Sequence, residues 1–273
     1  MLIRNFVSQT LTTMASITFH KYQGAGNDFI VIDDRNGVFD VNNEALVKRL
    51  CDRRYGIGAD GLMLLQAQPG YDFKMVYFNA DGREGSMCGN GGRCMVAFAR
   101  HQGLVGDNTV FLAVDGEHHA DINAEGNWVS LQMIDVPSIA HDGAAYLLDT
   151  GSPHYVQLVD NLANFPVYER GYAIRNSDAY RAEGINVNFV EPEGTGYFVR
   201  TYERGVENET LACGTGATAV ALAMAAHEGL EGDFQTPIRV LGGNLAIKFR
   251  KTGDSFTDVY LEGPAAFVFS GKI

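Results

Sequence analysis

Two cysteines, Cys88 and Cys213, each precede a Gly-x-Gly sequence that opens a mostly apolar run, and each follows a glutamate by four positions. The same pattern therefore occurs twice, over residues 84–104 and 209–230. The apolar runs predict helices that begin at the glycines. A cysteine at such a position lies beside unpaired N–H groups and the positive end of the helix dipole, which stabilise its thiolate. The same N–H groups can bind a carboxylate.

Two matched thiols suit a reaction that inverts a carbon atom bearing a hydrogen. Such a reaction needs a base on one face of the carbon and an acid on the other, with the roles exchanged in the reverse direction. The backbone N–H groups would stabilise the carbanion-like transition state through the carboxylate. Neither pattern has the lysine of a P-loop or a GxGxxG sequence, which disfavours a phosphate site. No pyridoxal-binding lysine or metal-ligand spacing is evident, so we expect no cofactor. We interpret Cys51 and Cys94 as packing residues.

The segments before and after the two cysteines have the hydrophobic patterns of helices and strands, and these elements must position the thiols. A helix is expected over 43–53, and the two cysteine helices over 89–102 and 214–228. Segment 161–184 reads as irregular with one helix. We expect strands near 17–22, 29–33, 62–66, 73–78, 110–114, 118–122, 128–134, 154–159, 186–190, 197–202, 238–241, 245–249 and 256–261.

This order of elements predicts an α+β fold with two similar lobes. Each lobe would be a mostly antiparallel sheet wrapped around one cysteine helix, because both helices are apolar nearly all round and must be buried. The active site would lie in the cleft between lobes. We place the first lobe at 15–135 and the second at 136–264, with 265–273 pairing back onto the first. Residues 1–14 read as a loose leader.

Composition narrows the class of protein. The chain has 273 residues and a formal net charge of −12, which argues against nucleic acid as a partner. No apolar run approaches the roughly 20 residues that span a bilayer, so no membrane partner is expected. The first residues lack the apolar core of a secretory signal. The four cysteines read as reduced thiols of a cytoplasmic protein that acts on a small molecule.

Six segments resemble the diaminopimelate epimerase family, and the resemblance extends from about residue 17 onward. They are KYQGAGNDFIVID (21–33), RRYGIGADG (53–61), FNADGREGSMCGNGGRC (78–94), GSPHYV (151–156), NVNFV (186–190) and YERGVENETLACGTGATA (202–219). The resemblance implies this family's fold and a homodimer. It also implies cofactor-independent interconversion of LL- and meso-2,6-diaminopimelate, in lysine and cell-wall precursor biosynthesis.

The resemblance also implies residue roles. Cys88 and Cys213 would be the acid/base pair, and His154 and Glu203 would tune their pKa values. The expected substrate-binding residues are Asn27, Asn79, Gly89, Asn90, Ser152, Asn186, Glu203, Arg204, Gly214 and Thr215. Taken alone, each asparagine reads as a turn or cap residue, and His154 as a structural histidine.

Two positions depart from the family pattern: Ser152 replaces a frequent asparagine, and Gly61 stands where some members carry glutamine. Both changes concern recognition of the substrate rather than the thiols. An alternative is a proline-type racemase or epimerase of the same superfamily, and another is a binding protein of this fold without chemistry. The distal ammonium and carboxylate of diaminopimelate would distinguish the first alternative, because the additional asparagines and the Glu203–Arg204 pair could engage them.

Overall fold

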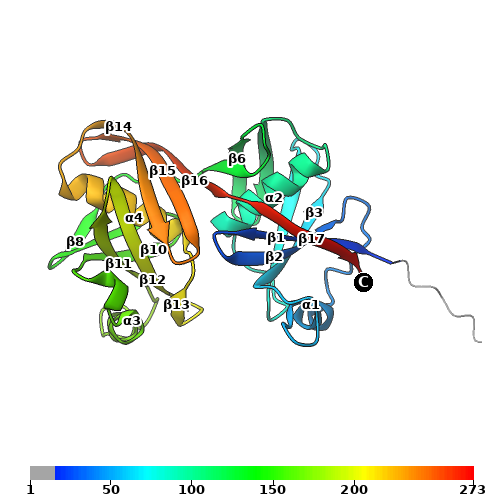
Figure 1. The fold of residues 1–273 in the computed structure, drawn as a ribbon, viewed down its shortest axis with the longest axis horizontal. Helices are drawn as coiled ribbons and strands as arrows, with labels where there is room; N and C mark the ends of the chain where they lie inside the picture. Colours follow the sequence, from blue (N-terminus) through cyan, green and yellow to red (C-terminus); the bar gives the residue numbers. More distant parts are fainter. Residues whose placement is uncertain (1–15) are drawn as a thin grey trace, which may run out of the picture.

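The computed structural model describes residues 16–273, which form two lobes side by side along the long axis of the molecule (Figure 1). The proposed leader at 1–14 lies outside the described residues. None of the helices in the described part of the chain is long and apolar enough to cross a membrane.

The first lobe contains two helices and seven strands of its own. The helices are α1 (Glu44–Cys51) and α2 (Gly89–His101). The strands are β1 (Thr18–Gly24), β2 (Asn27–Asp33), β3 (Gly61–Gln66), β4 (Phe73–Asn79), β5 (Asn108–Ala113), β6 (Gly116–Ile122) and β7 (Trp128–Gln132).

The second lobe contains helices α3 (Val167–Arg175) and α4 (Gly214–His227), and a 3-10 turn, η1 (Leu162–Asn164). Its strands are β8 (Ala140–Asp142), β9 (Ala145–Asp149), β10 (Pro153–Leu158), β11 (Asn186–Glu193), β12 (Gly196–Glu203), β13 (Asn208–Thr210), β14 (Gly232–Val240), β15 (Gly243–Thr252) and β16 (Ser255–Pro264). Strands β8, β9 and β13 were not predicted from the sequence.

The two lobes repeat one topology. Each runs through two strands, a short helix, two strands, a long helix and three strands, as β1 to β7 in the first lobe and β9 to β16 in the second, where the three-residue strand β13 is an addition before the long helix. In both lobes the second strand pairs parallel with the third (β2–β3, β10–β11), and the fourth with the fifth (β4–β5, β12–β14). The other pairings between strands of each repeat are antiparallel. The predicted two-lobed α+β fold is confirmed.

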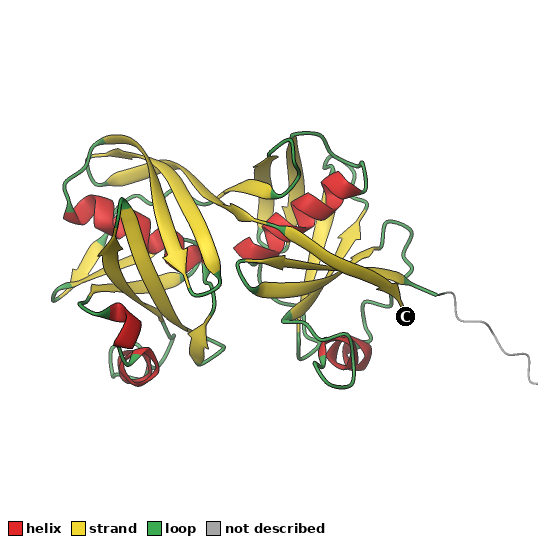
Figure 2. Cartoon of the chain, in the orientation of Figure 1, coloured by secondary structure: helices red, strands yellow, loops and turns green. Residues whose placement is uncertain are grey.

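Each long helix is the centre of its lobe (Figure 2). Residues 89–99 of α2 and nearly all of 214–225 of α4 are buried. The α4 core also includes Val190, Ile247 and Phe249, and the α2 core includes Phe29, Phe73 and Leu131. Burying these apolar surfaces is the main force that wraps the strands around the helices.

Two strands return the chain from the second lobe to the first. Strand β16 belongs to the second lobe and also pairs antiparallel with β7 of the first, from Tyr260 opposite Gln132 to Pro264 opposite Trp128. The last strand, β17 (Ala266–Lys272), then pairs antiparallel with β1. Figure 1 shows this red segment running across to the first lobe. The lobe boundaries at 135/136 and 264/265 stay predictions.

Candidate active site

Cys88 and Cys213 occupy the same position in the two lobes. Each is the N-cap of its long helix in extended backbone conformation, with φ of −112° at Cys88 and −116° at Cys213. The first residue after each cysteine is the glycine that begins α2 or α4. The repeated sequence pattern therefore places a thiol at the N-terminus of each central helix.

The two helix starts meet where the lobes join. A Cβ atom at Gly214 would lie 3.8 Å from the Cα of Gly89 and 2.7 Å from Cδ2 of Leu261 on β16. A Cβ atom at Gly89 would lie 2.8 Å from the same methyl group. The two glycines therefore begin their helices close to each other and against one leucine side chain, and a cysteine precedes each of them.

An amide cluster from the first lobe surrounds Cys88. Its thiol donates to Oδ1 of Asn27 at 3.6 Å, and Nδ2 of Asn90 points to the same oxygen at 3.4 Å. Asn90 also donates to the carbonyl of Ala212 in the second lobe at 3.2 Å, which ties the helix start of α2 to the residue before Cys213. Asp60 accepts from Nδ2 of Asn27 at 2.5 Å. This contact orients the Asn27 oxygen toward the thiol.

The residues after Cys213 are held by the loop before β10. The thiol of Cys213 lies 3.4 Å from Oγ1 of Thr215, and Oγ1 of Thr150 donates to the Thr215 carbonyl at 2.9 Å. A Cβ atom at Gly151 would lie 4.0 Å from Cγ2 of Thr215. This loop leads directly into Ser152. The polar residues around Ser152 therefore adjoin the start of α4 at Cys213.

Three of the expected substrate-binding residues, Ser152, Asn186 and Arg204, form one hydrogen-bonded group. Asn186 at the start of β11 donates to Oγ of Ser152 at 2.8 Å, and its Oδ1 accepts from the backbone N–H of Arg204 at 2.9 Å. The guanidinium of Arg204 donates to the same Ser152 hydroxyl at 3.2 Å. The shorter side chain at Ser152 is thus bound by both neighbours, and the Arg204 guanidinium is held beside Asn186.

Glu203, at the end of β12, places a carboxyl group near both thiols. Thr210 donates to its Oε2 at 2.9 Å. Burial raises the pKa of Glu203, and its negative charge raises the pKa values of Cys88 and Cys213 in turn. Glu203 is therefore electrostatically coupled to both members of the pair.

The expectation of lowered thiol pKa values is wrong for this structure. Burial raises the pKa of Cys88, and it raises that of Cys213 to about 12. Backbone N–H groups of Asn90 and Gly91 at one helix start, and of Gly216 at the other, act in the opposite direction but are outweighed. The helix ends favour the thiolates as expected, yet desolvation is larger, although Cys213 is buried and Cys88 is only partly buried.

His154 lies within β10, and no hydrogen bond among the described residues joins it to either thiol. Its Nδ1 is 3.0 Å from Nδ2 of Asn188, a donor, so Nδ1 is the unprotonated ring nitrogen. Burial, and then the charge of Arg204, lowers the pKa of His154 to about 3. A Cβ atom at Gly216 would lie 2.4 Å from Oδ1 of Asn188. Asn188 therefore connects neutral His154 with the first turn of α4, a link that the sequence analysis missed.

Asn79 and Tyr77 lie together next to Gly85, in the segment that leads to Cys88. Tyr77 was not among the site residues predicted from the sequence. A Cβ atom at Gly85 would lie 2.8 Å from the Tyr77 ring and 2.9 Å from Nδ2 of Asn79. A Cβ atom at Gly61 would lie 2.4 Å from Cε2 of Tyr77 and 2.8 Å from its hydroxyl oxygen. The Tyr77 ring thus fills the space that a side chain at position 61 would need. Burial, and then the charge of Cys88, raises the Tyr77 pKa.

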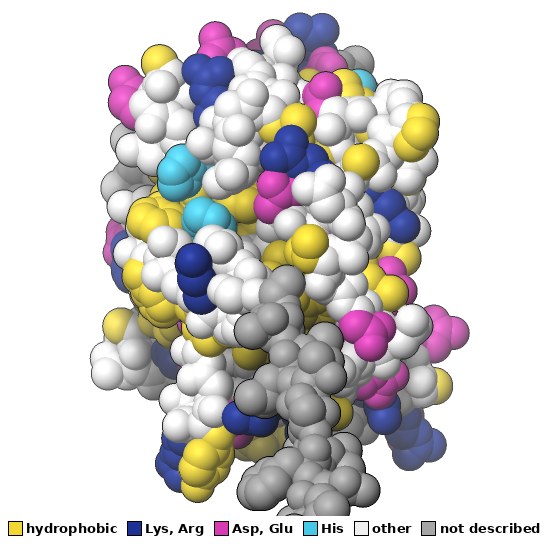
Figure 3. All heavy atoms as spheres, turned by 90° about the vertical axis from the view of Figure 1, so that its right-hand side faces the viewer, with side chains coloured by type: hydrophobic (Ala, Val, Ile, Leu, Met, Phe, Trp, Pro, Cys, Tyr) yellow, Lys and Arg dark blue, Asp and Glu magenta, His cyan; other side chains and the backbone are white. Residues whose placement is uncertain are grey.

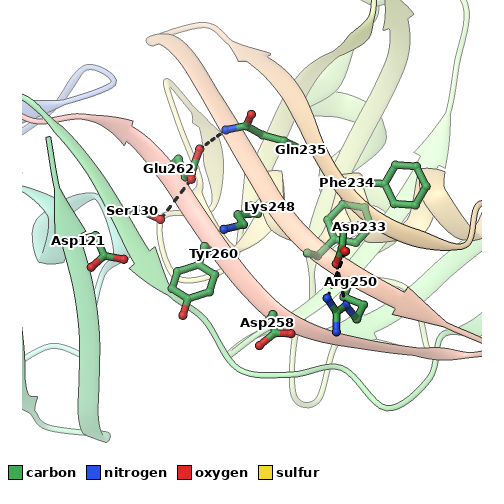
Figure 4. A pocket seen from close by; sticks show the side chains of 11 residues that line it. Asp121, Ser130, Asp233, Phe234, Gln235, Lys248, Arg250, Asp258, Tyr260 and Glu262 are labelled. Carbon is green, nitrogen blue, oxygen red and sulfur yellow. Dashed lines mark hydrogen bonds and ion pairs between the residues drawn. The ribbon is translucent and has the colours of Figure 1, made fainter. Parts of the chain in front are cut away.

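A surface groove lies apart from these residues. Figure 4 shows a groove of about 770 Å³ on the face of β14, β15 and β16. In it, Arg250 pairs with Asp233, and Glu262 accepts from Gln235 and Ser130. None of the expected site residues lines this groove. Arg250 and Asp233 are the one ion pair among the residues that line it, and no cysteine lines it, so it offers no equivalent of the two-thiol arrangement.

Comparison with known sequences agrees with this geometry. The profile of the family described as Diaminopimelate epimerase matches residues 19–138 and 146–268. A diaminopimelate epimerase of Flavobacterium psychrophilum is 52% identical over 256 residues, which cover 93% of this chain and 99% of the relative. The chain belongs to the diaminopimelate epimerase family. A member from Chlorobaculum tepidum is 44% identical over 262 residues, covering 92% of this chain and 98% of that protein.

Several solved structures have the same fold as this chain, although their sequence identity to it is low. A phenazine biosynthesis protein of the PhzF family from Bacillus anthracis has a TM-score of 0.74 and 14% identity, with 94% of this chain and 99% of that chain covered. A hydroxyproline epimerase from Agrobacterium vitis, crystallised with trans-4-hydroxy-L-proline, has a TM-score of 0.67 and 14% identity, with 94% and 92% covered. These two structures support the fold alone.

Proposed function

We propose that the protein interconverts LL- and meso-2,6-diaminopimelate by proton transfer through Cys88 and Cys213, without a cofactor. The observation that carries this proposal is the contact between Gly89 and Gly214, which brings two cysteine-capped helix starts together from opposite lobes. A carbon held between them has one thiol on each face. Family membership supports the choice of substrate.

In the proposed reaction one thiolate removes the α-hydrogen and the other thiol gives a proton to the opposite face. The N–H groups at the starts of α2 and α4 hold the reacting carboxylate, with Asn90 and Thr215 as the second helical residues. They stabilise negative charge that develops on it in the transition state. Both thiols have raised pKa values. The α-ammonium group of a bound amino acid would bring positive charge that favours one thiolate.

The distal end of the substrate distinguishes diaminopimelate from proline. It carries an ammonium and a carboxylate that need separate partners. Asn186, Ser152 and Arg204 form one polar group that can receive a carboxylate. Asn27, Asn79 and the Glu203 carboxyl supply acceptors on the side of the thiols. A proline-type substrate would leave one of these groups without a partner.

Deuterium incorporation at the α-carbon in heavy water tests the reaction. We expect LL-diaminopimelate to gain deuterium with the wild-type protein, and each variant, Cys88→Ser or Cys213→Ser, to interconvert the isomers about 10²–10⁴-fold more slowly. Cys94→Ser is the matched control, because Cys94 is buried in α2 and faces the core. Exchange into proline but not diaminopimelate would replace the proposal with the proline-type alternative. Absence of exchange into either amino acid would favour a binding protein.

We further propose that the protein works in the cytoplasm, in lysine and cell-wall precursor biosynthesis. Four free cysteines in the structure support a reducing compartment. The pathway follows from the proposed substrate. Loss of growth that diaminopimelate restores, in cells lacking the protein, would test this placement.

A homodimer is also proposed. Figure 3 shows hydrophobic side chains gathered beside two histidines on the end of the first lobe. On β17, Phe267, Val268 and Phe269 are each about half exposed. An exposed apolar strand of this kind commonly marks an interface. Light scattering of the purified protein measures the mass directly, and a monomer at assay concentration would contradict the proposal.

A further inference from the structure

Arg93, one turn beyond Cys88 in α2, is a buried cation that the proposed reaction does not use. Its side chain is 0% exposed, and within residues 16–273 no carboxylate forms an ion pair with it. A guanidinium stays protonated even when buried, so its charge is present inside the protein. Burying such a charge without an anionic partner is strongly unfavourable. Its retention calls for a compensating interaction.

The contacts of Arg93 point back to the start of its own helix. One terminal nitrogen donates to Oδ1 of Asn90 at 2.9 Å, and the other lies 3.4 Å from the carbonyl of Gly89. Because the guanidinium occupies Oδ1, the amide nitrogen of Asn90 faces Asn27 and the Ala212 carbonyl. Arg93 therefore fixes the orientation of the side chain that spans the two lobes beside both thiols.

The protein makes room for this cation at the lobe junction. A Cβ atom at Gly263 on β16 would lie 3.2 Å from Nε and 3.3 Å from Cζ of Arg93. The Nε atom is buried and has no partner among the described residues. The guanidinium is thus enclosed between the start of α2 and the strand that crosses between the lobes, where its field is not screened by water.

We propose that Arg93 is a positioning residue whose guanidinium orients Asn90 and whose buried charge stabilises the thiolate of Cys88. The effect on Cys88 does not depend on the substrate, whereas the effect on turnover rests on the proposed function. A residue that merely filled space would be replaceable by an apolar side chain of similar length without consequence for the thiol.

The electrostatics of the neighbourhood agree with this assignment. The groups whose charges reach Arg93 are the thiols of Cys94 and Cys88, and each favours its charged form. Cys88 also faces the Glu203 carboxylate, which opposes its ionisation, and the Tyr77 phenol. The charge of Arg93 lowers the Cys88 pKa and so counteracts burial and Glu203.

The test compares Arg93→Met with the wild-type protein in the absence of substrate. The rate of Cys88 alkylation by iodoacetamide is followed between pH 7 and 10 by mass spectrometry of the Cys88 peptide. We expect the rate at pH 8 to fall several-fold, because a smaller fraction of Cys88 is thiolate without the nearby cation. Arg100→Met is the matched control: it removes a cation from the same helix, but one that pairs with Asp107 near the surface. It should react like wild type.

Two further measurements keep the outcome decisive. In the interconversion assay, kcat of Arg93→Met should fall at least tenfold while that of Arg100→Met is unchanged. Should Arg93→Met not fold by circular dichroism, Arg93→Lys retains the charge without the planar fork. The lysine variant should keep the wild-type alkylation rate but lose several-fold in kcat. A folded Arg93→Met with unchanged alkylation of Cys88, or a lysine variant with slowed alkylation, overturns the proposal.

Discussion

Tyr77 is the residue that most alters expectations about recognition. Its ring lies between Gly61 and Gly85, so it occupies the space that a longer side chain at position 61 would take. Its phenol is within the field of Cys88, Asp60 and Glu203. Where some family members carry a glutamine side chain at position 61, this protein has Gly61, and the hydroxyl group of Tyr77 on β4 lies in the same space.

Replacing that hydroxyl should weaken substrate binding. In Tyr77→Phe the ring keeps its packing, but one hydrogen-bond donor to a charged substrate is lost, so we expect KM to rise about tenfold with little change in kcat. Steady-state kinetics with LL-diaminopimelate measure both values. Tyr55→Phe, at an exposed position, is the control. An unchanged KM in Tyr77→Phe would show that the phenol does not contact the substrate.

His154 gives the stability of the protein a pH dependence. Its pKa is about 3 in the folded protein because the ring is buried, whereas an unfolded histidine has a pKa of about 6.5. Between these values the unfolded chain binds the proton more strongly, so the contribution of His154 to stability is complete above pH 6.5. It decreases as the pH falls, by up to about 1.4 kcal/mol per pH unit.

Urea unfolding at pH 7.5, 6.5 and 5.5 should therefore show a decreasing free energy of unfolding. In His154→Gln this decrease should be shallower, because the group that takes up the proton is gone. His119→Gln removes an exposed histidine and should retain the wild-type dependence. Equal slopes for His154→Gln and the wild type would mean that other groups cause the loss.

At the scale of elements, the contact between the two helix starts depends on missing side chains. In Gly214→Ala the new methyl group would press on Leu261, whose side chain is fully buried. We expect a loss of about 1–3 kcal/mol in unfolding free energy, typical of overpacking, and a fall in kcat/KM as the helix starts separate. Gly106→Ala, where a Cβ atom would meet only Nη1 of Arg100 at 3.9 Å, an ordinary contact, is the control.

A double-mutant cycle isolates the contact. Leu261→Ala alone removes core volume and should cost about 2–5 kcal/mol. In the double variant the added methyl group enters the space vacated by Leu261, so its destabilisation should be smaller than the sum of the two single effects. Additive effects would indicate that the Gly214 methyl group clashes elsewhere.

Most elements could be predicted from sequence because their patterns are local. The two central helices carry a glycine start and an unbroken apolar run, and most strands show β-branched or aromatic alternation. Strand β8 is exposed throughout and β13 has three residues, so neither shows a burial pattern. Strand β9 forms a hairpin with β8 and escaped detection with it.

The site was predictable where chemistry follows from a short motif, and not where it follows from packing. The cysteines and their glycines belong to one repeated pattern. The sign of the thiol pKa shifts depends on burial by residues from both lobes, which spacing along the chain does not reveal. Tyr77, Arg93 and Asn188 act through contacts with glycines at distant positions, and only the three-dimensional structure brings these together.

At the scale of the whole molecule, two hairpin turns meet across the lobes. A Cβ atom at Gly242, between β14 and β15, would lie 1.8 Å from the carbonyl oxygen of Ala25, in the turn between β1 and β2. The backbone of Gly242 also donates to the carbonyl of Leu211, two residues before Cys213. This contact therefore sets the distance between the lobes close to the site.

Gly242→Ala should force the two turns apart. We expect secondary structure by circular dichroism to remain, while kcat/KM falls at least tenfold because the thiols no longer hold one carbon in register. The Gly106→Ala variant again serves as the reference. Wild-type activity in Gly242→Ala would show that the lobes tolerate a different spacing.

The pairing of β17 with β1 has a consequence for how the chain is made. Synthesis on the ribosome proceeds from β1 towards β17, so the strand that covers one edge of β1 emerges after all the strands between them. Until then the nascent first lobe presents an unpaired strand edge, a known route to aggregation. A chain that lacked β17 would therefore leave that edge of β1 uncovered even after every other strand had paired.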